Sequence, residues 1–328
     1  MRFGLYLNQY FHAPMRSVHA ELAEQAAALE ESGWDFLALG EGHLRGAGFQ
    51  EQLTTLAWLA GKTQRLGICS AGFILPLYDP VMLAEQLANL DQLSDGRLIC
   101  GVVLGYREEE FAMSGVPRAE RAMRLEAGLH VITRLWSGAA LDGTNPLFPR
   151  PGARLSVLPA QQPRPPTWIG AHVRSAIERA ARLGDGWIAS ANASASELAE
   201  KVGWFAGAAE AAGTRGEGVL MRDGFVADSA EEARRIVERP LLGLYAEYAG
   251  WKRDSPDAAK YFTLHFDDLR PKLVLGSPEE CVDQLRAYRD LGVDAVIMRM
   301  QYPGLAQADL LRAIRRFGSE VIPPLRDA

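Results

Sequence analysis

Short apolar runs alternate along the whole chain with longer segments whose apolar residues recur at helical spacing. The runs are brief and rich in aromatic and bulky aliphatic residues, which is typical of buried strands. Between the first two runs, Val18, Leu22 and Leu29 share one face of a helix. The predicted strands cover residues 3–8, 35–39, 66–75, 98–104, 166–170, 185–190, 221–227 and 294–300.

Eight strands with helices between them predict an α/β fold of the TIM (β/α)8 barrel type. The chain has 328 residues, which is within the usual length of that fold. The rival is a doubly wound sheet, which usually has a glycine-rich turn after its first strand. Residues 8–12, Asn-Gln-Tyr-Phe-His, contain no glycine, so the barrel is favoured. We expect a single domain over residues 1–328.

Two segments interrupt the alternation. Residues 138–165 are rich in glycine and proline, which is typical of a loop or a short hairpin. Residues 251–272 are polar and irregular. We therefore expect insertions before the fifth and the eighth strand, and we expect both to cap a pocket at the mouth of the barrel and exclude solvent.

The composition excludes several classes of protein. A net charge of −6 gives no general attraction to nucleic acid or to an anionic membrane. No apolar run reaches the roughly 18 residues of a membrane-spanning helix, and the first ten residues do not resemble a secretory signal. Cys69, Cys100 and Cys281 are far apart and odd in number, so we expect buried free thiols in a reducing cytoplasm.

Common motifs of catalysis and nucleotide binding are absent from the sequence. It contains no G-x-G-x-x-G, no P-loop, no H-E-x-x-H, no G-x-S-x-G and no paired C-x-x-C. Its six histidines have no close metal-ligand spacing, so we predict no metal site. A metal-dependent isomerase or lyase would need acidic residues or histidines clustered at several strand ends. In this chain just Glu41 and His43 lie close together.

The chemistry of a barrel enzyme is carried by the loops that follow its strands. In this chain those loops are polar but contain few acid–base pairs, which fits a cofactor-binding surface better than a hydrolase. The polar strand-end positions are Asn8, Glu41-Gly42-His43, Ala71-Gly72, Gly105-Tyr106-Arg107, Gly170-Ala171-His172, Ser190 and Arg299.

Six segments, taken in their order and spacing, form a specific pattern over nearly the whole chain. They are MRFGLYLN (1–8), GWDFLALGEGH (33–43), the stretch from Ser70 to Arg124, PPTWIG (165–170), RAARLGDGW (179–187) and GSPEECVDQL (276–285). The pattern resembles the bacterial luciferase-like flavin-dependent monooxygenases. That resemblance implies a TIM barrel that binds reduced FMN or, in some branches, the deazaflavin F420.

The resemblance also implies how the flavin is held. Ala71 and Gly72 match a bulge after the third strand that contacts the flavin ring, often through a non-proline cis peptide. Arg121 matches an arginine that contacts the flavin phosphate, a role that suits its forked guanidinium. From the helix pattern alone, Arg121 is more typical of an exposed surface arginine.

The remaining cofactor-binding candidates follow two other strands. Residues 170–173 and Ser175 match a backbone segment under the flavin, close to a helix start where free N–H groups favour a phosphate. Arg174 either adds charge there or is simply solvated. The candidates in these two loops are Leu104, Gly105, Tyr106, Gly170, Ala171, His172, Val173 and Ser175.

The sequence departs from luciferase itself at two places. Luciferase has an arginine where this chain has Leu104, and Tyr106 and Arg107 are candidates to compensate for it. Luciferase has Glu-His-His where this chain has Glu41-Gly42-His43, so the catalytic first histidine is replaced and light-emitting aldehyde oxidation is in doubt. His43 is the candidate catalytic acid–base residue, and the alternative is a structural histidine that fixes the loop.

The resemblance leads us to expect an FMN-dependent monooxygenase. Reduced FMN would react with O2 to give a C4a-(hydro)peroxide that oxidises a small organic substrate in a water-poor pocket. The alternatives are an F420-dependent oxidoreductase that transfers hydride without oxygen, and a non-catalytic flavin-binding protein. The expected apolar lining consists of Phe11, Phe73, Leu104, Trp187 and Phe225.

The resemblance also implies partners. Most FMN-dependent members take the reduced flavin as a diffusible substrate from a separate flavin reductase. The family forms dimers through its second and third helices, and residues 52–61 and 80–93 are apolar enough for a homodimer contact. The same apolar residues also fit helices that pack on their own barrel. No nucleic acid or membrane partner is expected.

Overall fold

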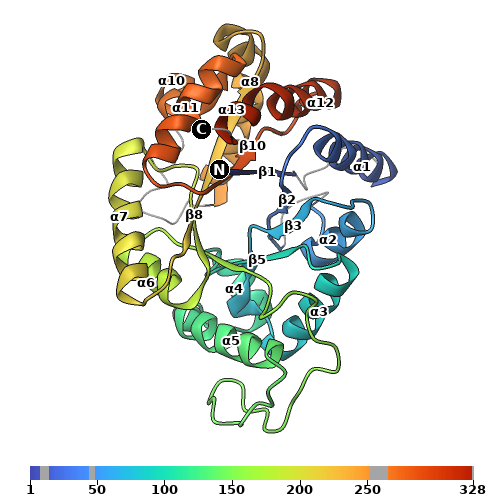
Figure 1. The fold of residues 1–328 in the computed structure, drawn as a ribbon, viewed down its shortest axis with the longest axis vertical. Helices are drawn as coiled ribbons and strands as arrows, with labels where there is room; N and C mark the ends of the chain where they lie inside the picture. The colour runs from blue at the N-terminus through green and yellow to red at the C-terminus, as the bar shows by residue number, and fades with distance from the viewer. Residues whose placement is uncertain (8–14, 44–48, 252–264, 327–328) are drawn as a thin grey trace.

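Parallel strands form a closed barrel with helices around it in the computed structural model (Figure 1). The structure describes residues 1–7, 15–43, 49–251 and 265–326. The barrel strands are β1 (Arg2–Tyr6), β2 (Phe36–Leu39), β3 (Gly67–Ser70), β5 (Leu98–Val103), β6 (Thr167–Gly170), β7 (Gly186–Ala189), β8 (Glu217–Val226) and β10 (Ala295–Arg299). Neighbouring strands pair in chain order, and β10 pairs with both β8 and β1. This closure confirms the predicted TIM barrel.

Side chains along each strand alternate between the inside of the barrel and the surrounding helices. The register keeps this alternation in step across strands: Ile297 of β10 pairs with Gly4 of β1 and with Met221 of β8. The inside is therefore a packed core rather than a pore. Its buried residues are Phe36, Ala38, Cys69, Ile99, Trp168, Ile188, Val219, Ala295 and Ile297.

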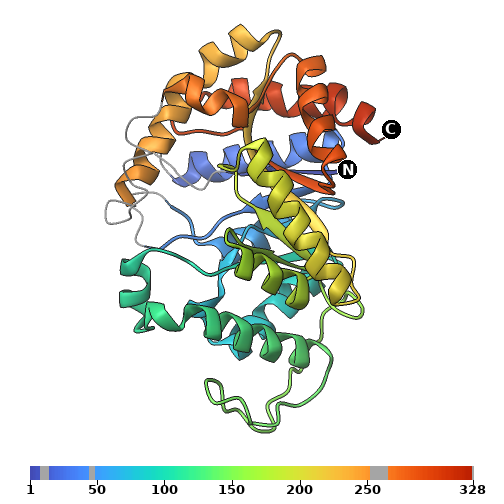
Figure 2. The same ribbon diagram turned by 90° about the vertical axis from the view of Figure 1, so that its left-hand side faces the viewer.

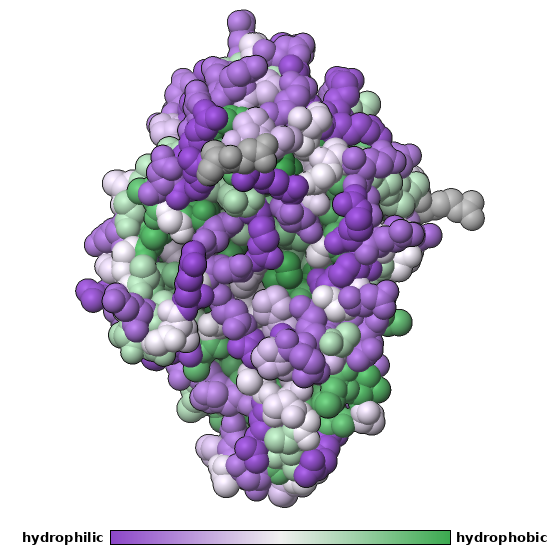
Figure 3. Space-filling view, in the orientation of Figure 1, coloured by the Kyte–Doolittle hydropathy of each residue, from purple (hydrophilic) through white to green (hydrophobic). Residues whose placement is uncertain are grey.

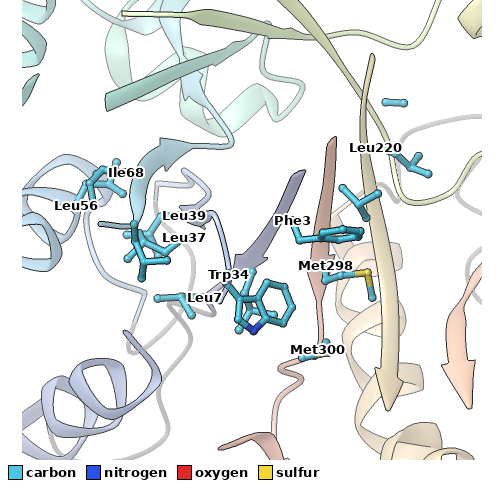
Figure 4. Packing of buried hydrophobic residues seen from close by; sticks show 14 of the residues in the cluster. Phe3, Leu7, Trp34, Leu37, Leu39, Leu56, Ile68, Leu220, Met298 and Met300 are labelled. Atoms are coloured by element: carbon cyan, nitrogen blue, oxygen red, sulfur yellow. The ribbon is translucent and has the colours of Figure 1, made fainter. Parts of the chain in front are cut away.

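A second, larger hydrophobic cluster lies between the strands and the helices. Figure 4 shows part of it, where Phe3 and Met298 of two paired strands lie beside Trp34. The indole N–H of Trp34 donates to the carbonyl of Ile314 at 3.1 Å, so this buried ring leaves no unpaired donor. The covering helices are α1 (Met15–Glu31), α2 (Gln52–Ala60), α3 (Pro80–Leu93), α5 (Arg121–Trp136), α6 (Arg174–Leu183), α7 (Ala195–Ala211), α8 (Ala230–Trp251), α11 (Pro278–Asp290) and α12 (Gln307–Arg316).

The structure adds short elements that the sequence pattern did not predict. The third predicted strand is broken after β3, and β4 (Phe73–Ile74) and the short helix η1 (Leu75–Leu77) follow the break. The strand predicted at 221–227 begins earlier, at Glu217, because this charged residue pairs with Arg2 at the closed end of the barrel. The other additions are α4 (Glu108–Ser114), η2 (Arg118–Glu120), β9 (Val274–Gly276), which pairs with the end of β8, and two C-terminal turns, η4 (Phe317–Val321) and α13 (Pro323–Arg326).

The first insertion does not cap the barrel mouth, so that expectation is wrong. Between α5 and β6 the chain forms no helix or strand, and it lies beside α5 in both views (Figures 1 and 2). The side chain of Gln161 contacts Asp91 of α3 at 2.7 Å and the first residue of β5, Leu98, at 2.8 Å. The physical reason is the direction of the chain. The helices run back from the mouth, so a segment that joins a helix to the next strand starts at the opposite end of the barrel.

The second insertion is described in part. Residues 252–264 lie outside the described residues. The rest forms α10 (Phe266–Leu269) and η3 (Arg270–Lys272) before β9. The three cysteines are buried and free, as predicted. In the described part of the chain, no helix is long and apolar enough to cross a membrane.

Candidate functional site

The barrel mouth, at the carboxyl ends of the strands, is where the predicted site residues meet. Tyr6, Ala71, Val103 and Met221 are partly exposed there, whereas Ala38 and the other residues one layer deeper are buried. The mouth is therefore open to solvent above a closed core. The predicted residues Asn8 and Phe11 lie outside the described residues.

The break between β3 and β4 forms part of the backbone surface at the mouth. The peptide bond between Ala71 and Gly72 is cis, the isomer that the resemblance implies. A Cβ atom on Gly72 would lie 2.7 Å from the carbonyl carbon and oxygen of Gly101. Ser70 fixes this approach, because its hydroxyl donates to the Gly101 carbonyl at 2.6 Å and accepts from the Gly101 N–H at 2.7 Å. Glycine is therefore required at position 72.

Two more glycines extend this surface on the neighbouring strands. Gly170, at the end of β6, has Val103 Cγ1 2.8 Å from the place of a Cβ. Gly105, after β5, has φ +71° and Ile74 Cγ2 2.5 Å from that place, a backbone conformation that L side chains rarely adopt. We call Ala71, Gly72, Gly105 and Gly170 the glycine cradle.

Glu41 and His43 follow β2 and lie beside the glycine cradle. The buried carboxylate of Glu41 accepts hydrogen bonds from the Ile74 N–H and from the hydroxyl of Tyr78. His43 Nε2 lies 3.3 Å from Glu41 Oε1, and 28% of the histidine side chain is exposed. The hydrogen bond and the charge of Glu41 raise the pKa of His43 above its ordinary value, although burial opposes the shift.

Helix α4 holds the backbone of the same loop. The His43 N–H donates to Glu110 Oε1 at 2.8 Å, and Arg107 Nη1 donates to the His43 carbonyl at 2.7 Å. The side chains of Glu110, in α4, and Arg107, the residue before α4, are both buried, and they lie 3.4 Å apart. Arg107 is thus a buried residue that fixes the His43 loop, rather than a surface arginine.

Arg121 and the start of α6 lie at the same end of two neighbouring helices. Arg179 Nε donates to Glu126 Oε1 at 2.6 Å, and each residue lies five positions into its own helix, so the two helices begin at the same end. Arg121 makes a single hydrogen bond within the described residues, to the Gly105 carbonyl at 3.2 Å. Burial, together with the nearby Arg118, lowers the pKa of Arg121. At the start of α6, Val173 supplies no side-chain cap.

The other predicted residues are distributed around this end. Tyr106, His172 and Val173 are exposed, Ala171 is buried, and Ser175 lies in the first turn of α6. The side chain of Leu104 packs against the outer hydrophobic cluster. Phe73, Trp187 and Phe225 are buried in the same cluster, and the ring of Trp187 packs against Phe205 of α7, so the prediction that Trp187 lines the pocket is wrong. On β7 the next residue, Ile188, faces the inside of the barrel, so alternation turns Trp187 toward the helices.

A buried group of polar side chains occupies the opposite side of the mouth. Arg299, the last residue of β10, forms two parallel hydrogen bonds to Asp223 of β8, one of them 2.7 Å long. Its Nη1 donates to the hydroxyl of Tyr248 at 2.7 Å. The hydroxyl of Tyr245 lies 2.8 Å from Asp223 Oδ2 and 2.9 Å from Asn192 Oδ1. We call Asn192, Asp223, Tyr245, Tyr248 and Arg299 the polar wall.

The polar wall is mostly a feature that sequence reasoning missed. Arg299 was a strand-end candidate, but its partners were not identified. Burial alone would lower the pKa of Arg299, yet the charge of Asp223 outweighs it and raises that pKa well above its ordinary range. The available signal was two charged residues in each of two otherwise apolar strands, at 221–227 and 294–300, with Asp223 and Arg299 among them. Charges in such strands are rarely buried unless they are paired.

Arg222 fixes the loop that carries Asn192. It is fully buried, and it donates to the carbonyls of Ala191 and Ala193 at 2.7 and 2.8 Å. No group of three or more His, Cys, Asp or Glu side chains within the described ranges is placed to hold a metal ion. A cavity of about 620 Å³ lies away from the mouth, between α5 and residues 141–148.

Comparisons with known proteins agree with this architecture. A sequence profile of the family described as luciferase-like monooxygenase matches residues 1–295. The chain is 23% identical to the oxygenase component of a flavin-dependent trigonelline monooxygenase from Acinetobacter baylyi, over 100% of this chain and 96% of that protein. It is 25% identical to an F420-dependent glucose-6-phosphate dehydrogenase from Nakamurella multipartita, over 94% of this chain and 93% of that protein.

A solved structure gives the same result for the fold. The monooxygenase RslO1 from Streptomyces bottropensis matches this chain with a TM-score of 0.85 and 20% sequence identity, over 99% of this chain and 100% of that one. At this level of identity the likeness establishes the barrel architecture.

Proposed function

This chain belongs to the luciferase-like monooxygenase family, and from that premise we propose that it is a monooxygenase that uses reduced FMN and O2 to oxidise a small organic molecule. Reduced FMN, when bound, supplies the electrons that activate O2. The work of this chain is then to bind the flavin, orient its ring, keep water away and hold a proton at a defined atom.

The observation that carries the proposal is the state of Arg121. Its guanidinium is half-buried, and no described carboxylate forms an ion pair with it. A bound phosphate would supply the missing charge, and a guanidinium binds two phosphate oxygens at once. The start of α6 lies on the same side with its first N–H groups free of a side-chain cap, which also favours an anion.

The glycine cradle fits the flat ring of the flavin. Each of its glycines lies where a methyl group would collide with neighbouring atoms, so the backbone itself forms the contact surface. In this proposal Ala71, Gly72, Gly105 and Gly170 lie against the ring. Leu104, Tyr106, Ala171, His172, Val173 and Ser175 complete the surroundings, with Ser175 nearest to the phosphate and His43 as the acid–base residue.

The proposed partners are a flavin reductase and a second copy of the chain. The relative from Acinetobacter baylyi is an oxygenase component, which supports a separate source of reduced flavin. Met82 and Leu93 of α3 are 55% and 69% exposed, and Figure 3 shows apolar surface at the lower right, over α3 and its neighbours. These residues support a homodimer contact through α2 and α3.

Anaerobic titration tests the flavin site directly. The purified protein is titrated with reduced FMN, reduced riboflavin and reduced F420, and air is then admitted while oxygen consumption is measured. We expect tight binding of reduced FMN, weaker binding of reduced riboflavin, and oxygen uptake by the FMN complex. Binding of F420 alone, without oxygen uptake, would move the protein to hydride transfer.

Two arginine variants test whether Arg121 contacts the flavin phosphate. Arg121→Ala removes a charge-assisted phosphate contact of about 1.5–3 kcal/mol, so the affinity for reduced FMN should fall roughly ten- to hundredfold. The affinity for riboflavin, which has no phosphate, should not change. The control is Arg118→Ala, because Arg118 is exposed and pairs with Glu108 at 3.4 Å. Equal losses in the two variants, or equal losses for the two flavins, would contradict the phosphate assignment.

A further inference from the structure

Glu41 brings together donors from three parts of the chain. Its Oε2 accepts from the Ile74 N–H of β4, and its Oε1 accepts from the Tyr78 hydroxyl, one residue beyond η1. His43 Nε2, from the loop after β2, is the third group, at 3.3 Å from the same Oε1. The carboxylate is almost fully buried, so its orientation is fixed by these groups.

This arrangement decides which nitrogen of His43 carries the proton in the neutral ring. A carboxylate has lone pairs and no hydrogen, so the group that faces it must donate. Burial and the charge of Glu41 raise the pKa of Tyr78, which keeps its hydroxyl protonated and donating. His43 Nε2 must then hold a hydrogen as well, because two lone pairs at this separation repel each other.

The other ring nitrogen is the available one. Within the described part of the chain, His43 Nδ1 has no hydrogen-bond partner, and the partly exposed side chain lies at the mouth. The backbone contacts to Glu110 and Arg107 hold the loop in place, and the contact of Nε2 with Glu41 holds the ring itself. A neutral imidazole held in this way offers one basic atom in one direction.

We propose that Glu41 and Tyr78 are positioning residues that fix His43 as its Nε2–H tautomer, so that Nδ1 is the atom that exchanges a proton at the barrel mouth. The role of Nδ1 in turnover rests on the proposed monooxygenase function. The tautomer itself does not depend on that function and can be measured on the protein alone.

Charged groups from every packed element act on this ring. Glu41 lies in its own loop, Arg107 and Glu110 come from the start of α4, and Glu51 caps the start of α2. Three carboxylates against one guanidinium favour the protonated ring. The Glu41 hydrogen bond is the largest cause of the raised pKa of His43, against the opposing effect of burial. Proton exchange at Nδ1 is therefore shifted to a higher pH than in an ordinary histidine.

Nitrogen-15 NMR of the histidine rings tests the proposal on the protein without flavin. His43→Gln assigns the signal. Above the titration of His43, the wild-type ring should show the pattern of a single Nε2–H tautomer. Glu41→Gln should lower the pKa of His43 and give a mixture of tautomers, because the charged acceptor is lost.

Tyr78→Phe should move the pKa of His43 in the opposite direction. Removing the hydroxyl takes away one donor that shares Oε1 of Glu41, so the carboxylate acts more strongly on His43 and raises that pKa, while the aromatic ring at position 78 keeps its contact with Phe73 at 6.0 Å between centroids. A purely structural role for Tyr78 would not give shifts of opposite sign in the two variants. The matched control is Glu109→Gln on α4, whose side chain is 65% exposed and which should leave the His43 signals unchanged.

The possible results of these experiments distinguish the tautomer assignment from the proposed monooxygenase function. An Nδ1–H tautomer in the wild type, or no change in Glu41→Gln, would overturn the positioning roles. The expected NMR result, with no effect of His43→Gln on the pH profile of FMN-dependent oxygen uptake, would overturn the role of Nδ1. Failure to bind reduced FMN would refute the proposed function while the tautomer assignment stands.

Discussion

The two sides of the barrel mouth are built in opposite ways. The polar wall consists of charged and aromatic side chains that hydrogen-bond to each other across β8, β10 and α8. The glycine cradle consists of backbone, and at its three glycines an added methyl group would collide with a neighbouring atom. The wall is therefore damaged by removing atoms and the cradle by adding them. The comparison shows that hydrogen-bonded side-chain pairs fix the polar wall, whereas the backbone of the glycine cradle leaves no room for larger side chains at its glycines.

Removing one partner of the buried ion pair should have the largest effect. In Asp223→Asn the buried Arg299 loses its charged partner, and we expect the free energy of unfolding in urea to fall by about 3–5 kcal/mol. The control is Asp283→Asn, because Asp283 and Arg286 form an exposed pair at 3.0 Å, which contributes about 0–1 kcal/mol. Similar losses in the two variants would show that the wall does not stabilise the fold as a buried pair.

Adding one methyl group to the cradle should have an intermediate effect. In Gly72→Ala the new Cβ meets the Gly101 backbone at 2.7 Å, which cannot move without disturbing the pairing of β5. We expect a loss of about 1–3 kcal/mol in the free energy of unfolding and weaker binding of reduced FMN. Gly61→Ala is the control, since its Cβ would be 3.6 Å from the nearest atom and the backbone is helical.

If Gly72→Ala were as stable as wild type and bound the flavin equally well, the contact at 2.7 Å would not be limiting. If Gly61→Ala lost as much stability as Gly72→Ala, the loss would reflect glycine replacement in general. Both results would remove the contrast between the cradle and the wall.

The pH dependence of stability should give the smallest effect. The pKa of His43 is raised in the folded protein, so its protonated form stabilises the fold. This contribution is fully present below the unfolded pKa, near 6.5, and is lost as the pH rises through the higher folded pKa. Unfolding of wild type and His43→Gln should therefore differ most near pH 5.5, by at most about 1 kcal/mol, and converge toward pH 9.

The same series of unfolding measurements at different pH distinguishes the glycine cradle side of the mouth from the polar wall. The raised pKa of Arg299 keeps its guanidinium charged over this range, so the cost of Asp223→Asn should stay constant between pH 6 and pH 9. A constant difference for His43→Gln, or a cost for Asp223→Asn that disappears at pH 9, would contradict the assignment of the titrating group to the cradle side.

Much of the fold could be predicted from the sequence because buried parallel strands and amphipathic helices have distinct local patterns. The start of α11 is an example of such a pattern: Ser277 and Glu280 hydrogen-bond to each other's backbone N–H groups, and Pro278 occupies the first helical position. The early start of β8 could not be predicted, since Glu217-Gly218 resembles a turn until Arg2 and Trp168 supply its partners. β9 has three residues, too few to give a pattern.

The position of the site could be predicted from the sequence better than the contacts between its side chains. The resemblance indicated Gly72, Arg121 and His43, whose roles stay predictions. It did not indicate the polar wall, whose ion pair joins residues 76 positions apart in the sequence. It also led to a wrong lining, because residue type alone does not reveal which face of β7 Trp187 occupies. Register settles that question, and register is a property of the closed sheet.

The closure of the ring by β1 and β10 has a consequence for the way the protein is made. Phe3 pairs with Val296, so the first partner of this contact leaves the ribosome long before the second. During that interval β1 has β2 on one side and an unfilled row of hydrogen-bonding groups on the other, which is the kind of edge that pairs with foreign chains. The free edge of β1 therefore needs protection during translation, although both edges of β1 are paired in the finished barrel.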